Sequence, residues 1–224
     1  MVSIVIPSRA EGAGLLACLT AATRIAGVGE IVVSAHHESA ATREAAEHRD
    51  ERVRWVECPR ASRGDQLNRG TAIARGEVLL FLHADTRLPA EAIEHMTRAL
   101  LDDGVVGGAF RLAFDASHPV LDLLSAASRV AWPTAFFGDQ AMFCRREVFE
   151  QLGGFRDAPL FEDVELARAL ARRGKLVRLD PRATTSSRRF VAAGPARQLA
   201  RNVALLALHY LGIPARTLAR SYRP

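Results

Sequence analysis

A fully apolar run at residues 78–82, Val-Leu-Leu-Phe-Leu, is the feature that most limits how this chain can fold. Such a run is typical of a strand buried on both faces, as in a parallel sheet covered by helices on each side. It ends in His83-Ala84-Asp85-Thr86. Since open α/β sheets bind ligands beyond the carboxyl ends of their strands, a histidine and a carboxylate are predicted at the ligand edge of the sheet.

Short β-rich runs alternate with stretches of helical period along most of the chain, which is the pattern of βαβ units on a largely parallel sheet. Strands are predicted over residues 2–6, 30–34, 53–57, 77–82, 107–114, 141–144 and 176–179, of which 107–114 alternates like an antiparallel strand. Helices are predicted over 12–24, 40–48, 63–74, 90–101, 119–130, 147–152, 162–173 and 195–211, and a loop over 133–138. A chain of 224 residues has room for one such α/β domain. We place that domain at residues 1–190, followed by a helical tail at 191–224.

The chain is basic, with a formal charge of +5, but the excess is small and almost entirely arginine, Lys175 being the single lysine. The arginines are scattered and form no stripe with stacking aromatics, so no nucleic-acid partner is predicted. Anionic small molecules or an acidic membrane surface fit this pattern better. The three cysteines have no metal-ligand spacing, and the N-terminus has no secretory signal, so we expect a cytoplasmic protein with reduced thiols.

Two acidic positions can carry chemistry. Asp85 can bind a divalent cation that neutralises a diphosphate, or it can cap the turn before Pro89. Glu162-Asp163, which follow Gly153-Gly154-Phe155, can supply a general base, or they can simply favour the first turn of a helix. On these residues alone both interpretations stay open.

Three further segments are polar. Arg63 stands at a glycine-marked helix start, which is either an anion site or a solvated helix face. The cluster Ser187-Arg188-Arg189-Phe190 can hold phosphates or form solvated surface. His36-His37 are interpreted as loop residues. Neither a GK[ST] phosphate loop nor a GxGxxG after a strand occurs in the sequence.

Several of these segments occur together in a specific order and spacing. They are Ile4-Val5-Ile6-Pro7, residues 63–70, residues 81–89, Gly138-Asp139-Gln140 with residues 143–146, and residues 153–155 with 162–166. In this arrangement, which covers about residues 2–190, the chain resembles glycosyltransferase family 2, and within it the small bacterial enzymes of the arsenosugar-biosynthesis type. The resemblance implies a GT-A fold, the Rossmann-like, mostly parallel sheet of nucleotide-diphospho-sugar transferases, flanked by helices. It also implies inverting transfer from a nucleotide sugar with a divalent metal, Mn²⁺ or Mg²⁺.

The site residues follow from the same resemblance. Asp163 would be the catalytic base with Glu162 beside it, and Asp85 and His83 would hold the metal. The residues implied to bind the donor are Pro7, Arg9, Glu11, Arg63, Gln66, Asp85, Asp139, Gln140 and Arg188. The chain departs from the family at two places. His83 replaces the first acid of the usual Asp-x-Asp, which favours a nitrogen-tolerant ion such as Mn²⁺. The usual acids after the second strand are replaced around residues 34–37, so the donor can be UDP- or GDP-linked.

We therefore expect an inverting glycosyltransferase acting on a small-molecule or lipid-linked hydroxyl. The alternatives are a non-catalytic nucleotide-sugar-binding protein and a nucleotidyltransferase. The amphipathic segment 195–211, with Arg197 and Arg201, either packs on the domain or lies in a membrane interface. In the second case the protein would be peripheral at the inner face of the membrane.

Overall fold

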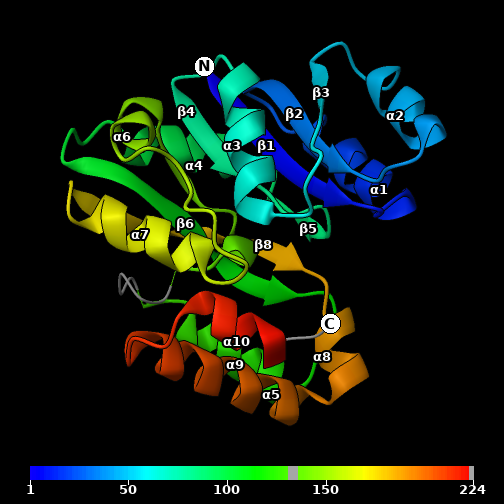
Figure 1. Cartoon of the computed structure of the whole chain (residues 1–224). Helices are drawn as coiled ribbons and strands as arrows, with labels where there is room; N and C mark the ends of the chain where they lie inside the picture. The colour runs from blue at the N-terminus through cyan, green and yellow to red at the C-terminus, as the bar shows by residue number, and fades with distance from the viewer. Residues whose placement is uncertain (131–135, 222–224) are drawn as a thin grey trace.

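The computed structural model describes residues 1–130 and 136–221. One eight-stranded sheet runs through it in the order β3-β2-β1-β4-β7-β6-β8-β5 (Figure 1). The strands are β1 (Val2–Arg9), β2 (Val28–His36), β3 (Val53–Glu57), β4 (Val78–Phe81), β5 (Thr86–Arg87), β6 (Val105–Phe114), β7 (Phe143–Arg145) and β8 (Lys175–Thr185). The helices are α1 (Ala13–Ala22), α2 (Ala40–Glu47), α3 (Arg63–Ile73), α4 (Ala92–Ala99), α5 (Pro119–Ala127), α6 (Arg146–Gln151), α7 (Glu162–Ala171), α8 (Arg188–Ala193), α9 (Pro195–Tyr210) and α10 (Ala215–Ser221), with a 3-10 turn, η2, at Gly138–Gln140.

The first half of the sheet is parallel, because β3, β2, β1 and β4 pair in one direction. The second half is mixed, since β7 is antiparallel to both of its neighbours and β6 is parallel to β8. The α/β fold with flanking helices and C-terminal helices is confirmed. Residues 107–114 were predicted to form an antiparallel strand. The corresponding strand β6 is antiparallel to β7 but parallel to β8. The carboxyl ends of β1, β2 and β4 meet at one edge, as expected for a parallel unit.

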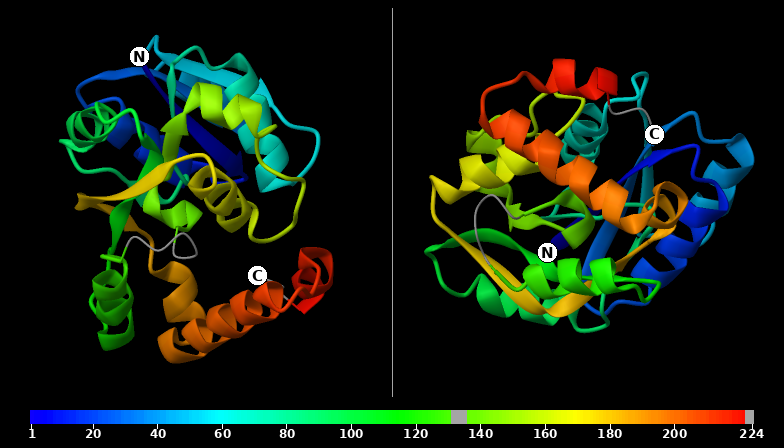
Figure 2. Two further views of the ribbon diagram at one scale, coloured as in Figure 1. Left: turned by 90° about the vertical axis from the view of Figure 1, so that its left-hand side faces the viewer. Right: turned by 90° about the horizontal axis from the view of Figure 1, so that it is seen from below.

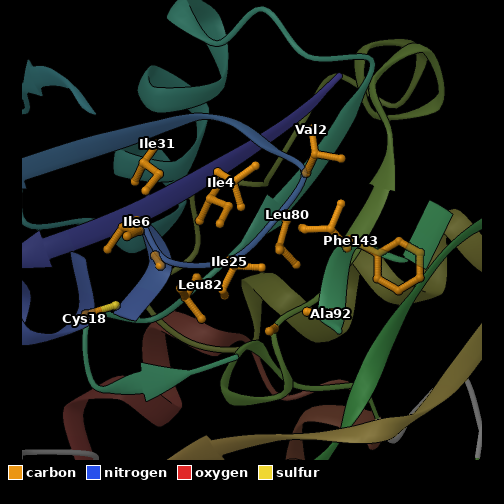
Figure 3. Packing of buried hydrophobic residues seen from close by; sticks show 14 of the residues in the cluster. Val2, Ile4, Ile6, Cys18, Ile25, Ile31, Leu80, Leu82, Ala92 and Phe143 are labelled. Carbon is orange, nitrogen blue, oxygen red and sulfur yellow. The ribbon is translucent and has the colours of Figure 1, made fainter. Parts of the chain in front are cut away.

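Both faces of the sheet are buried, which explains the continuous apolar runs. Ile4 and Ile6 of β1 point to one apolar cluster together with Leu80 and Leu82, as Figure 3 shows. Val5 points to the other face, where it packs in a second cluster with Leu79 and Phe81. Successive residues of a strand face opposite sides, so every residue of β4 except Val78 is buried.

Among the described strands and α-helices, three have no counterpart in the sequence predictions: β5, α8 and α10. β8 was predicted as 176–179 but continues to Thr185, where it pairs with β5. The proposed domain boundary after residue 190 falls inside α8. The loop expected at 133–138 lies partly outside the described residues.

Helices α5, α8, α9 and α10 form a layer on the underside of the molecule, seen from below in Figure 2. α9 contacts α5, α8 and α10. It buries Gln198 and Leu205, whereas Val203 and the following Leu211 are exposed. The apolar face of α9 is therefore only partly used in packing on the domain. No helix among the described residues is long and apolar enough to cross a membrane.

Candidate active site

The loop between β4 and β5 carries His83 and Asp85 to the ligand edge. The backbone N–H of Thr86 donates to the carbonyl of His83 at 3.0 Å, which closes a turn. β5 then pairs with the end of β8, and the N–H of Ser186 donates to the carbonyl of Asp85 at 3.2 Å. This pairing fixes the loop against the strand that leads into α8.

The first turn of α7 carries Glu162 and Asp163. The Asp163 carboxylate accepts two backbone hydrogen bonds, at Oδ2 from Gly138 (2.6 Å) and at Oδ1 from Val164 (2.7 Å). A Cβ placed on Gly138 would lie 2.5 Å from Nε2 of His83 and 3.3 Å from Oδ2 of Asp163. Gly138 is thus the point where the His83 loop and the predicted base meet, and it has room for no side chain.

Glu162 has a different environment from Asp163. It is buried, and its Oε1 pairs with the Arg63 guanidinium at 3.1 Å. Burial raises the pKa of Glu162, as does the neighbouring Asp163, while the charge of Arg63 opposes both. Arg63, at the start of α3, therefore fixes the first turn of α7 in place.

Asp139, in η2, lies near both Asp85 and Asp163. Its Oδ1 is buried and has no hydrogen-bond partner in the part of the chain that the structure describes. Burial raises the pKa of Asp139 to about 7, and the charges of Asp163 and Asp85 act in the same direction, against Arg63 and Arg178. An unsatisfied carboxylate oxygen at this position would suit a cation or a donor hydroxyl.

The resemblance implies Asp85 and His83 as metal ligands. These two residues fit a metal site only if the phosphates of the donor supply further ligands. Within residues 1–130 and 136–221 there is no group of three or more His, Cys, Asp and Glu side chains that could hold a metal ion. Burial, with the charges of Arg63 and Arg189, holds the pKa of His83 well below its ordinary value, so the imidazole is neutral. Asp85 and a neutral His83 are acceptable ligand types, and small cations commonly take one or two carboxylates and complete their coordination with substrate phosphates.

A second polar group lies at the ends of β1 and β2. The Glu38 carboxylate accepts hydrogen bonds from the Ser8 hydroxyl (2.6 Å) and from the backbone N–H groups of Glu11 (2.7 Å) and Gly12 (3.2 Å). Glu11 also pairs with Arg188 of α8 at 3.8 Å. Glu38 was not predicted, although an acid just beyond the second strand is a signal that the sequence contains.

The remaining predicted donor residues are placed less directly. Gln66 is buried and donates from Nε2 to the carbonyls of Ser8 (2.6 Å) and Ser34 (3.0 Å), which ties β1 to β2. Gln140 is also buried and accepts at Oε1 from the Arg178 guanidinium at 2.7 Å. These two glutamines support the backbone around the site.

Pro7 is buried within β1, whereas Arg9 is exposed at its end. Arg178 of β8 was not predicted. Its guanidinium lies over the Phe136 ring, 4.1 Å from the centroid, and burial lowers its pKa to about 10, against the effect of Asp139. Arg189, predicted only as part of a phosphate-binding or solvated cluster, is near enough to lower the pKa of His83. A donor-binding role stays a prediction for all of these residues.

A sequence profile described as glycosyl transferase family 2 matches residues 3–153, which is most of the chain. The chain belongs to glycosyltransferase family 2. The arsenosugar-type subclass stays a prediction, and no curated protein matches this family 2 chain significantly.

Solved structures share the fold of this family 2 chain at low sequence identity. A mannosyltransferase, PcManGT from Pyrobaculum calidifontis in complex with GDP-Man and Mn²⁺, is 20% identical with a TM-score of 0.66, over 82% of this chain and 56% of that one. TarS 1–349 from S. aureus is 12% identical with a TM-score of 0.65, over 92% and 65%. The same protein in complex with UDP-GlcNAc is 13% identical with a TM-score of 0.63, over 83% and 58%. The chain thus matches less than two thirds of the length of these relatives.

Proposed function

We propose that this family 2 chain transfers a sugar from a nucleoside-diphosphate donor to a hydroxyl acceptor by an inverting single displacement. The supporting observation is the meeting, at Gly138, of the His83 to Asp85 loop with the first turn of α7. Inverting transfer needs a diphosphate site and a base on opposite sides of one sugar carbon. This arrangement offers a site for each within one small volume.

Asp163 is the general base in this proposal. It accepts the proton of the acceptor hydroxyl while the hydroxyl oxygen bonds to the anomeric carbon and the bond from that carbon to the diphosphate oxygen breaks. The N–H groups of Gly138 and Val164 orient its carboxylate. Glu162, paired with Arg63, acts by positioning Asp163.

Asp85 is the residue that would hold a divalent cation, Mn²⁺ or Mg²⁺, with His83 as the second ligand from the protein. When bound, such a cation supplies positive charge to the departing diphosphate. Arg63, Arg178 and Arg189 add fixed positive charge around the same site, as their effects on Asp139 and His83 indicate. The nucleotide end of the donor would lie toward Glu11 and Arg188.

The donor is a UDP- or GDP-linked sugar, and the acceptor a small-molecule or lipid-linked hydroxyl, in the cytoplasm. The test is a donor panel of UDP-Glc, UDP-GlcNAc and GDP-Man read by thermal shift, with and without Mn²⁺. A ligand that binds only the native state raises the melting temperature. Failure of every donor to do so, with or without metal, would overturn the proposal.

A second assay separates transfer from its alternatives. Release of nucleoside diphosphate from the stabilising donor, alone or with acceptors, supports a transferase. Donor stabilisation with no release under any condition would indicate a non-catalytic binding protein. Pyrophosphate release from a nucleoside triphosphate and a sugar 1-phosphate would indicate a nucleotidyltransferase.

A further inference from the structure

A pocket separate from the active site lies on the underside, between α5 and the adjoining strands β6 and β8. Three arginines line it, one from each of these segments: Arg111 of β6, Arg129 just after α5 and Arg182 of β8. Arg111 and Arg182 are register partners on neighbouring strands, where the pairing is irregular. Since like charges opposite one another destabilise a sheet, this arrangement calls for a compensating negative charge.

The protein supplies only part of that charge. Arg111 pairs with the exposed Asp180, and this pairing, with smaller effects of Arg129 and Arg182, lowers the pKa of Asp180. Nε of Arg111 is buried without a hydrogen-bond partner, and Arg129 and Arg182 make no ion pair among the residues described. Asp122, also at the pocket, is exposed and accepts from the Ser117 hydroxyl at 3.5 Å.

Several guanidinium donors therefore converge with few acceptors. A group with several negatively charged oxygens, such as a phosphate, is the ligand that arginines of this kind bind best. The hydroxyl of Ser125 lines the same pocket and is a further polar group for such a ligand.

The surroundings of the pocket favour one source of phosphate. Leu123 of α5 is 63% exposed and Val130 is 55% exposed, and Leu211, which directly follows α9, is 80% exposed; α9 contacts α5. Seen from below, α5, α8 and α9 lie side by side on this face (Figure 2). Exposed apolar side chains beside a basic pocket are typical of a surface that rests in a membrane interface.

The charge distribution of the whole chain points the same way. All 25 acidic residues precede position 181, whereas eight of the basic residues, all arginines, follow it. The helices of the underside that follow β8 thus contain no acid to repel an anionic surface. Arginines close to a bilayer are attracted to the negative surface of anionic lipids.

We propose that the underside docks on an anionic bilayer and that the pocket between Arg111, Arg129 and Arg182 takes the phosphate of a phospholipid headgroup. Membrane docking through this surface is a separate property from sugar transfer and does not depend on it. Its test therefore uses binding alone, so failure of the transferase assignment would leave it untouched.

The experiment measures flotation of the full chain with vesicles of phosphatidylcholine, with and without phosphatidylglycerol. Binding is expected only to the phosphatidylglycerol vesicles, and it should weaken as salt is raised. The double variant R129Q/R182Q, which changes two exposed side chains, should lower the partition coefficient about tenfold. The control R43Q/R98Q removes the same charge from α2 and α4 and should leave binding nearly unchanged.

Two further variants separate the contributions of charge and of apolar contact to vesicle binding. R129K/R182K retains the charges and should recover most of the binding, and L123S/V203S should weaken it without changing the net charge. Equal losses in the two double arginine-to-glutamine variants would overturn the site, because net charge alone would then explain binding. Stabilisation by inorganic phosphate or glycerol 3-phosphate without vesicle binding would overturn the membrane assignment in favour of a free phosphate ligand.

Discussion

Asp163 differs from its neighbour Glu162 in how its carboxylate is held. Two backbone N–H groups orient it, whereas Glu162 pairs with the Arg63 guanidinium. Replacing Asp163 with Asn keeps an oxygen acceptor but removes the base. Transfer should fall about 10²- to 10⁴-fold, with donor affinity within a few fold, since a base acts in the transition state.

Rates and donor affinities of Asp163→Asn should be compared with those of Asp103→Asn, which changes an exposed carboxylate elsewhere. The control should behave as the wild type. A large loss of donor affinity in Asp163→Asn would show that the residue has a structural role instead.

Asp85 is the other carboxylate whose role can be isolated. Asp85→Ala should weaken donor binding and flatten its dependence on Mn²⁺, because metal and diphosphate are expected to bind as one unit. Calorimetric titration of the donor at several Mn²⁺ concentrations measures both effects. Metal-independent donor affinity in the wild type would rule out this role.

Asp139 should make the stability of the protein depend on pH. Its native pKa of about 7 lies above the ordinary value, so the native state binds more protons than the unfolded state between about pH 4 and 7. Stability contributed by this group is therefore lost as pH rises through that range. Asp139→Asn, which resembles the protonated form, should be more stable than the wild type, with an advantage that grows toward pH 7 and then levels off.

Urea unfolding in EDTA without donor, from pH 5 to pH 8, measures this difference. Asp103→Asn serves again as the control and should show no such trend. A constant difference between Asp139→Asn and the wild type at all pH values would contradict the predicted titration.

At the scale of elements, α9 holds the start of α7. The His209 ring stacks on Phe161 at 4.8 Å between centroids, and its Nε2 lies 3.0 Å from Oε1 of Glu165. Phe161, just before Glu162, has a left-handed backbone with φ of 65°. A non-glycine residue in this region costs about 1 kcal/mol or more, so the packing of His209 helps to retain it.

His209→Ala should lower the free energy of unfolding by about 1 kcal/mol and reduce kcat several-fold, with the KM for donor unchanged. Val203→Ala, which truncates a 57% exposed side chain of the same helix, should change neither quantity appreciably. Chemical unfolding and steady-state kinetics of the two variants check this. Equal effects in both would mean that α9 stabilises the protein only in a general way.

Local sequence signals located most elements but not all. The β3 prediction matches its observed ends, and α3 differs by one residue, because a short β-rich segment and a capped helix start are local features. β5 has two residues, and its Thr86 bonds the hydroxyl of Thr185, 99 positions away. No window of sequence around Thr86 contains that pairing.

The same limit applies to the site. Asp85, Glu162 and Asp163 could be proposed from a strand end and a helix start, which are local positions. The convergence of His83 and Asp163 on Gly138, and the use of Gln66 to bond two strand ends, depend on tertiary contacts. Residue type and spacing therefore indicated which segments meet. They did not indicate which side chains make hydrogen bonds within the protein rather than facing a ligand.

At the scale of the whole molecule, the layered α/β architecture follows from the alternation of apolar strands and helices, whereas the strand order does not. β7 enters between β4 and β6, which brings residues 143–145 beside residues 78–80 and 107–108. This insertion turns the sheet from parallel to mixed and carries Gly138–Gln140 to the ligand edge. Such long-range pairing is set by the fit of the assembled layers.

β8 connects the active site to the underside pocket. Arg178, bonded to Gln140 at the active site, and Arg182, in the underside pocket, are four residues apart on this one strand. At the rise of a β-strand, that separation is about 13 Å. A bilayer that held the pocket would therefore keep a lipid phosphate within about this distance of Arg178, so a lipid-borne hydroxyl would have to reach over a comparable length to meet the donor, whereas a dissolved acceptor is under no such restriction.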